Sequence, residues 1–263
     1  MAKTNKRRDA ERRSAAAAKV AEMQRAQRAK DRRRQGLTVT GIVVALIIVL
    51  VGAFVLIQNQ RSAKDVAGKE VKGVTADYGF VLGKKSAPVK VIAYEDFQCP
   101  VCKNFEDSSG DTLSKYVKDG TVQLEYRPIA FLDQMSSTQY STRSLNAAAC
   151  VMDADGIHTF KKFHDSLYAN QPPENGDGLP DSQLVSLANK AGANGKGVAT
   201  CIKQEKHKDW TASATEAASK SSAMHKGLGT PAVLVNGDLL DIKTVLSPNA
   251  FKAAIDKAAK KSK

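Results

Sequence analysis

Hydrophobic residues are distributed very unevenly along this chain, and the densest region is the 22-residue run 36–57. It contains no charged side chain. At about 1.5 Å per residue a helix of this length reaches roughly 33 Å, enough for a hydrocarbon core of about 30 Å. A buried helix of a soluble protein normally keeps a polar stripe, and this run has none. The pattern predicts one transmembrane helix over residues 36–57.

A cleaved signal peptide is the alternative interpretation of this run. The charged region ahead of it is 35 residues long, and the run exceeds the apolar core of about 7–15 residues that signal peptides contain. Residues 58–64 also lack a clear small-x-small cleavage site. We therefore favour an uncleaved anchor, followed by a polar linker over 58–77 that lifts a domain off the membrane.

Shorter apolar patterns beyond the linker predict a folded α/β domain over residues 78–263. Period-two alternation and turn residues indicate strands at 80–83, 89–94, 121–127, 231–235 and 239–242. Helical patterns occupy about 101–118 and 249–260, and a mostly helical block fills about 136–226. This order of elements is that of a thioredoxin fold with an inserted helical domain: a strand, a helix, a strand, the helical block, a hairpin and a final helix.

Charge gives the predicted span a direction. Residues 1–35 hold 13 Lys or Arg and 4 Asp or Glu, a net charge of +9, whereas the other 228 residues hold 27 and 23, a net of +4. Basic residues beside a membrane span stay in the cytoplasm. We expect a cytoplasmic tail over 1–35 that faces the lipid bilayer, with the domain outside the cell membrane. Such a tail can also contact phosphates, but it has no interleaved aromatics and no folded module, so no nucleic-acid partner is expected.

The main candidate for chemistry is the motif Cys99-Pro100-Val101-Cys102, which lies between a predicted strand and a predicted helix. The first turn of a helix has unpaired N–H groups and a positive dipole end, and both favour a thiolate at Cys99. Cys102 lies about one turn further on, close enough to attack a mixed disulfide formed by Cys99. This spacing indicates thiol–disulfide exchange.

Half of a zinc site is the rival interpretation of this motif. It requires a second pair of ligands at the right spacing, but Cys150 and Cys201 stand apart and no histidine pair lies beside a cysteine. The sequence also has no phosphate loop and no nucleotide fingerprint. We expect neither a metal nor a cofactor.

Cys150 and Cys201 both lie in helical patterns. Four cysteines allow three pairings, and only the pairing 150–201 leaves the exchange motif as its own pair. An exported domain favours that structural disulfide. Two buried free thiols that pack as small apolar residues are the alternative.

Four stretches together resemble the DsbA family, and more narrowly the membrane-anchored DsbA-like thioredoxin-fold proteins of Gram-positive actinobacteria. They are residues 79–83, 87–91, 95–102 and 229–237. The resemblance covers roughly 78–260. It implies a thioredoxin fold, oxidation of dithiols in exported client proteins, and a quinone-linked membrane partner of the DsbB or VKOR type that reoxidises the domain.

The resemblance also implies roles for single residues. Cys99 matches the exposed nucleophile and Cys102 the resolving cysteine. Thr230-Pro231 matches a loop that faces the active site and has a cis peptide bond before the proline, although an ordinary trans turn is the alternative for this pair alone. A cis bond there lets the Thr230 backbone pair with an extended substrate strand.

The sequence departs from the family pattern in two places. Well-studied members have a histidine where this chain has Val101, so the Cys99 thiolate is expected to rely on the helix terminus and backbone N–H groups alone. That weakens the case for strong oxidising power and keeps a reductase, an isomerase or a non-catalytic client-binding module as alternatives. A buried acid six residues before the first cysteine is replaced by Ala93. Strand alternation leaves open whether Glu95 or Asp96 takes over proton transfer or whether both are solvated.

Overall fold

The computed structural model describes residues 70–195, 197–227 and 229–262. The predicted tail over 1–35, the predicted span over 36–57 and most of the predicted linker lie outside these residues. No helix within the described residues combines the length and the apolar character needed to cross a membrane.

A five-stranded sheet with the strand order β1-β3-β2-β4-β5 forms the centre of the domain. Its strands are β1 (Phe80–Leu82), β2 (Val89–Glu95), β3 (Val122–Pro128), β4 (Ala232–Val235) and β5 (Asp238–Leu239). The central strand β2 runs parallel to β3 and antiparallel to β4. The carboxyl end of β2 therefore lies beside the beginning of β4, because neighbouring antiparallel strands run in opposite directions.

Alternation along β2 sends its side chains to two different layers. Val89, Val91 and Ala93 are fully buried in the larger core. Helices α2 (Pro100–Asp119) and α9 (Pro248–Lys261) contribute to the same core, and the rings of Phe105 and Phe251 meet edge to face at 5.4 Å. Helix α2 is capped at its C-terminus by Gly120, whose φ of 82° lies in the left-handed region that favours glycine.

The opposite layer is smaller. Tyr94 lies in a second apolar cluster with residues of α6 (Lys208–Ser219) and α7 (Ser222–Gly227), including Ala218 and Met224. The Tyr94 hydroxyl accepts a hydrogen bond from the guanidinium of Arg127 in β3 at 2.8 Å. The sheet is thus covered on both faces, as expected for a strand whose side chains are buried on both sides.

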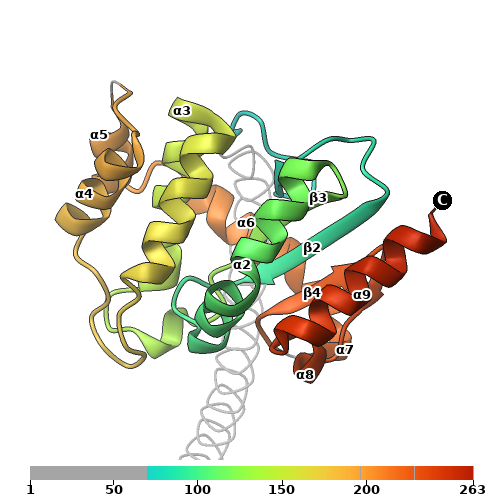
Figure 1. Ribbon diagram of the computed structural model, residues 1–263. Coiled ribbons are helices and arrows are strands. Elements are labelled where there is room, and N and C mark those ends of the chain that lie inside the picture. The colour runs from blue at the N-terminus through green and yellow to red at the C-terminus, as the bar shows by residue number, and fades with distance from the viewer. Residues whose placement is uncertain (1–69, 196, 228, 263) are drawn as a thin grey trace, which may run out of the picture. The chain divides into compact units, whose positions relative to one another are not determined.

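The predicted helical block is confirmed as an insertion between β3 and β4. It contains α3 (Tyr140–Ala169), α4 (Asp181–Ala191), α5 (Val198–Lys203), α6 and α7, preceded by a short 3-10 turn at Asp133–Met135. Figure 1 shows α3, α4 and α5 gathered on one side of the domain and α9 on the other. The insertion packs on the sheet through stacked rings, since the ring centroids of Phe80 in β1 and Phe160 in α3 lie 4.0 Å apart.

Helix α3 contains a break at Gly156, where φ is 75° and ψ is −174°. This conformation is open to glycine and strained for other residues. The break divides α3 into a segment that carries Cys150 and a segment that carries Phe160 and Phe163, both fully buried. One helix therefore presents different residues to the insertion core and to the sheet.

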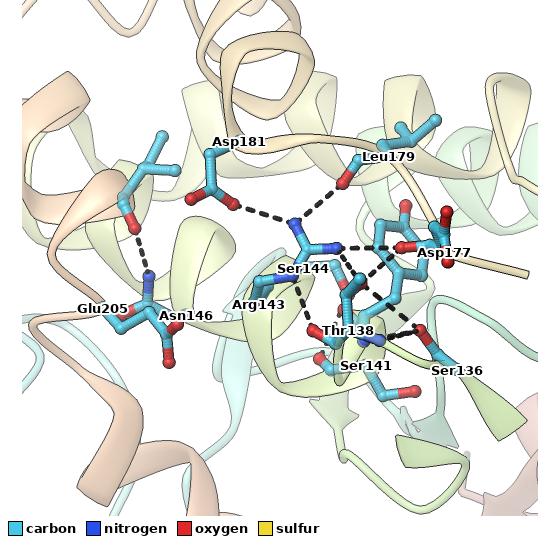
Figure 2. Close-up of polar contacts among 12 residues, drawn as sticks. Ser136, Thr138, Ser141, Arg143, Ser144, Asn146, Asp177, Leu179, Asp181 and Glu205 are labelled. Atoms are coloured by element: carbon cyan, nitrogen blue, oxygen red, sulfur yellow. Dashed lines mark hydrogen bonds and ion pairs between the residues drawn. The ribbon is translucent and has the colours of Figure 1, made fainter. Parts of the chain in front are cut away.

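Arg143, near the start of α3, holds two loops against the insertion. Its guanidinium donates hydrogen bonds to the carbonyl oxygens of Thr138 and Leu179 at 2.8 Å each, and it pairs with the Asp181 carboxylate at 2.8 Å. Figure 2 shows these bonds converging on Arg143 from both sides. The rigid fork of arginine suits such a role, because its donors can meet several acceptors at once.

The structure differs from the prediction in one strand and in the start of the domain. Residues 239–242 were expected to be a strand, but β5 ends at Leu239 and Ile242–Val245 forms a short helix, α8. The reason is Asp241, whose carboxylate accepts a hydrogen bond from the Thr244 N–H at 3.0 Å and caps that helix. In addition, Val71 is buried and Val74 forms a bridge with Phe80, so the folded unit includes residues ahead of the predicted boundary at 78.

Candidate active site

Cys99 lies at the N-terminal cap of α2, directly after the turn that follows β2. Its N–H donates to the carbonyl oxygen of Asp96 at 2.9 Å, and its own carbonyl accepts from Lys103 at 3.2 Å. Pro100 occupies the first turn of the helix, where a missing N–H costs nothing. This local geometry places the Cys99 sulfur at the positive end of α2, as the sequence predicted.

Thr230 lies beside Cys99 at the carboxyl end of β2. The Cys99 sulfur lies 3.3 Å from the Thr230 carbonyl oxygen, although the two residues are 131 positions apart in the sequence. The Thr230–Pro231 peptide bond is cis, as expected. The pairing of β4 with β2 produces this contact, because it brings the residues just before β4 to the carboxyl end of β2.

The Cys99 sulfur is stabilised as a thiolate. Its pKa is lowered to about 6, first by a hydrogen bond from the Cys102 thiol, then by one from the Thr230 side chain and by the N–H groups of Cys102 and Val101, which together outweigh burial. The expectation that the thiolate would rely on the helix terminus and backbone N–H groups alone is therefore wrong. Two side chains replace the donor that Val101 cannot supply.

Cys102 has the opposite character. It is fully buried, and burial, its bond to Cys99 and the nearby charge of Glu95 raise the pKa of its thiol well above the ordinary value. Cys99 is also buried, with 5% of its surface exposed, so the resemblance is wrong in implying an exposed nucleophile. Both cysteines are free thiols in this structure. At neutral pH the pair therefore contains one reactive thiolate and one protonated, inaccessible thiol.

Alkylation of the reduced protein at pH 6 is expected to modify Cys99 first. About half of Cys99 is ionised at that pH, whereas an ordinary thiol with a pKa of about 8.5 would have roughly a hundredfold less thiolate. Peptide mass spectrometry after brief treatment with iodoacetamide measures the site and extent of labelling. The Cys99→Ser variant is the control, and its Cys102 should stay unmodified. Faster labelling of Cys102 in the unaltered protein would reverse the assignment.

Asp96 is fully buried and organises the turn before Cys99. Its carboxylate accepts hydrogen bonds from the Ser141 hydroxyl at 2.6 Å and from the N–H groups of Gln98 and Leu132 at 2.8 Å each. Burial outweighs these bonds and raises the pKa of Asp96 to about 6. The alternative of a solvated carboxylate is therefore wrong for Asp96. Its hydrogen bonds join three parts of the chain: the turn before Cys99, the loop that follows β3, and helix α3.

Glu95 is also fully buried, so the solvated alternative is wrong here too. Its Oε2 lies 3.1 Å from Nε2 of His164 on α3, and its Oε1 has no hydrogen-bond partner among the described residues. Burial raises the pKa of Glu95, and the charge of Glu106 adds to this effect. Glu95 shares a face with Val91 and Ala93, a relation that strand alternation could have indicated.

Two further partners of the site were not found from the sequence. Gln171, in the loop after α3, donates from its side-chain amide to the carbonyl oxygens of Phe97 and Cys99 at 3.0 Å each. Gln98 donates to the Met135 carbonyl at 2.6 Å. Both bonds join segments far apart in the chain, and a lone glutamine gives no signal of such a contact.

Two groups of side chains among the described residues have ligand atoms close enough for a metal, within 4.8 Å of one another. In the group Cys150, Cys201 and His207 the two sulfurs are already bonded to each other. In the group Glu95, Glu106 and His164, Glu95 is hydrogen-bonded to His164, and Glu106 accepts a hydrogen bond from the Tyr126 hydroxyl. We therefore assign the second group as a buried acid–base cluster.

Cys150 and Cys201 form the expected disulfide, which joins α3 to α5 with their Cα atoms 5.9 Å apart. Cys150 is buried in the core of the insertion beside Asn146. The bond lies within the helical insertion and leaves Cys99 and Cys102 as the only free cysteines in the described chain.

Comparisons with known proteins agree with this arrangement. The protein-family model described as thioredoxin matches residues 75–257. The chain is 28% identical over 229 residues to the probable disulfide bond formation protein D of Bacillus cereus, covering 86% of this chain and 98% of that protein.

Solved structures show the same likeness. The reduced DsbA of Mycobacterium tuberculosis is 30% identical with a TM-score of 0.54, and the match covers 70% of this chain and 99% of that one. Oxidised BdbD of Bacillus subtilis is 26% identical with a TM-score of 0.57, covering 73% and 95%. The extent of the family match, together with these relatives, shows that the chain belongs to the thioredoxin family and is a DsbA-like thiol:disulfide oxidoreductase.

Proposed function

We propose that the protein is tethered to the cell membrane and introduces disulfide bonds into exported proteins by exchange at Cys99 and Cys102. The observation that carries the proposal is the opposite character of the two sulfurs. Cys99 forms a stabilised thiolate at a helix terminus beside Thr230, and Cys102 is a buried thiol one turn away. A stabilised thiolate is a good leaving group, which a disulfide donor needs.

The exchange takes two steps. A client thiolate attacks the Cys99 sulfur of the Cys99–Cys102 disulfide, and the electron pair of the broken bond leaves on Cys102. A second client thiolate then attacks the client sulfur of the mixed disulfide, and Cys99 leaves as a thiolate. The client loses two electrons and the protein gains them. A quinone-linked membrane oxidase of the DsbB or VKOR type would then accept these electrons from the reduced domain.

The surroundings of Cys99 suit an extended, partly unfolded client. The Thr230 backbone beside the sulfur can pair with a client strand, as in recognition by added β-strands. Phe131 is 53% exposed in the loop after β3, and the bond from Leu132 to Asp96 fixes that loop next to the turn before Cys99. An exposed aromatic ring there offers apolar contact to a chain that has not yet folded.

The reduction potential separates disulfide donation from reduction or isomerisation. A Cys99 pKa near 6 lies between the pKa of about 7 of thioredoxin and that of about 3.5 of DsbA, so we expect a potential between the roughly −270 mV of thioredoxin and the roughly −120 mV of DsbA. Equilibration with glutathione buffers, followed by alkylation and mass spectrometry, measures it. The Cys150→Ala/Cys201→Ala variant restricts the signal to the exchange pair. A value near −270 mV would favour the reductase alternative suggested by Val101.

Membrane tethering rests on the uncharged run 36–57 and on the net charge of +9 ahead of it. Protease added to intact cells or spheroplasts is expected to remove the domain and to spare a tagged 1–35 segment, because basic flanks stay inside. Immunoblotting for both ends measures the outcome, and lysed cells serve as the control. Recovery of a soluble form that begins near residue 60 would show a cleaved signal peptide instead.

A further inference from the structure

The turn over residues 96–99, which leads from β2 into α2, is bonded to the helical insertion at each of its four residues. Asp96 is bonded to helix α3, and Gln98 is bonded to the 3-10 turn over 133–135. Phe97 and Cys99 contribute their carbonyl oxygens, and both accept hydrogen bonds from the side-chain amide of Gln171 at 3.0 Å each. The insertion therefore reaches the backbone of Cys99 itself through the side chain of Gln171.

The position of the Cys99 backbone matters because its sulfur is stabilised from two directions. The N–H groups of Val101 and Cys102 lie at the start of α2, whereas Thr230 lies in the loop before β4. Cys99 is the N-terminal cap of α2, outside the regular helix, and its side chain makes no capping bond there. The ends of helices fray more readily than their interiors. A small rotation of this cap would move the sulfur away from one group of donors or the other.

Gln171 gives this cap a second restraint. The Cys99 carbonyl oxygen accepts the N–H of Lys103 at 3.2 Å, at the long end of the range for such bonds, and it accepts the Gln171 amide at 3.0 Å. The same amide nitrogen donates to Phe97, so both of its hydrogens are used. The two bonds brace the turn on either side of Gln98.

The loop that carries Gln171 is itself held at both ends. Gln171 follows the C-terminal end of α3, and its N–H donates to the carbonyl oxygen of Tyr168 at 3.2 Å. Pro172 comes next and disfavours the helical conformation for the residue before it. At the far end of the loop, Arg143 donates to the Leu179 carbonyl at 2.8 Å (Figure 2). A side chain supported in this way can hold a reactive group in one position.

We propose that Gln171 is a positioning residue that holds the Cys99 cap against the helical insertion, an inference that rests on the proposed exchange at this cysteine. By bonding to two carbonyl groups of the turn, it keeps the sulfur between the N-terminus of α2 and Thr230. Gln171 acts through the backbone and transfers neither protons nor electrons. The insertion thus contributes to the reactivity of Cys99 in addition to covering the sheet.

The test measures the titration of Cys99 in the full-length protein, reduced at its exchange pair. The ultraviolet absorbance of the thiolate, followed against pH, gives the pKa of Cys99, because the raised pKa of Cys102 keeps that thiol protonated over the same range. Gln171→Met removes both donors, keeps a similar length and adds no charge. Asn170→Leu is the matched control, because the Asn170 amide donates to the Ser166 carbonyl at the end of α3, at 2.9 Å.

We expect Gln171→Met to raise the pKa of Cys99 by about one unit, since a displaced cap weakens a hydrogen bond to the thiolate. The thiolate fraction at pH 6 should then fall about fivefold. At pH 7 the equilibrium with glutathione should move about fivefold toward the oxidised protein, because the reduced form loses stabilisation. Asn170→Leu should change neither quantity. Both variants leave in place the titratable groups that act on Cys99, which are Cys102 on α2 and Asp96 in the turn.

An unchanged pKa of Cys99 in a folded Gln171→Met variant would overturn the positioning role. An equal rise in Asn170→Leu would also overturn it, because that result indicates a general loosening of the loop. If Gln171→Met fails to fold, Gln171→Glu decides, since a carboxylate cannot donate to a carbonyl group, and Asn170→Asp is its control of equal charge. A Cys99 pKa in the range of a free thiol in the unaltered protein would be a different result, and it would remove the thiolate on which the proposed function rests.

Discussion

Replacement of Cys99 by serine is expected to abolish disulfide formation in a reduced client protein completely. Serine cannot form the mixed disulfide, and Cys102 is fully buried with a raised pKa, so it cannot substitute as the nucleophile. Refolding of a reduced, disulfide-containing client, followed by its recovered activity and free thiol content, measures the effect. The rate should fall to that of the client alone.

Two matched variants sharpen this prediction. Cys102→Ser retains the Cys99 thiolate but has no resolving thiol. When this variant is mixed with a client that already contains a disulfide, Cys99 attacks that bond, one client cysteine leaves as a thiolate, and the mixed disulfide between Cys99 and the client should accumulate. Cys150→Ala/Cys201→Ala removes two cysteines outside the motif and should retain exchange per folded molecule. Full function of Cys99→Ser would instead support the alternative of a non-catalytic client-binding module.

Loss of the Cys150–Cys201 disulfide is expected to be the largest single change in stability. The bond closes a loop with a sequence separation of 51 residues, which corresponds to about 4 kcal/mol in the loop-entropy model. Domains of this kind are stable by only about 5–15 kcal/mol, so the loss is substantial. Urea unfolding of Cys150→Ala/Cys201→Ala, compared with the unaltered protein, measures the difference.

The same experiment distinguishes a structural bond from a marginal one. Cys99→Ala/Cys102→Ala removes the same number of cysteines without opening the loop, and it serves as the control for the change in side-chain packing. A decrease below about 1 kcal/mol in the 150–201 variant would show that packing around α3 and α5 holds the insertion together without the bond.

The sequence predicted the features that depend on neighbours in the chain. The position of Cys99 between a strand and a helix follows from local patterns, and the described structure agrees with it. The family resemblance supplied the contact with Thr230, which the pairing of β4 with β2 explains. The short helix at Ile242 was missed because the cap at Asp241 competes with an apolar pattern that also fits a strand.

Contacts that are formed by tertiary packing could not be predicted from the sequence. His164 is 69 residues from Glu95, and only the packing of α3 on the sheet brings them together. Alternation along β2 does place Glu95 on the face of Val91 and Ala93, but it cannot name the partner on the opposite helix. The stabilisation of Cys99 by Cys102 and Thr230 likewise depends on the arrangement of side chains around the sulfur.

The turn held by Asp96 has a consequence for the proton stoichiometry of the redox cycle. Burial is the largest cause of the raised pKa of Asp96, about 6, and the charge of Cys99 adds a smaller contribution. Disulfide formation removes that charge, so the pKa of Asp96 falls and its carboxyl releases part of a proton into solution. Around pH 6 each two-electron oxidation therefore releases a non-integral number of protons, and the slope of the reduction potential against pH changes across that range.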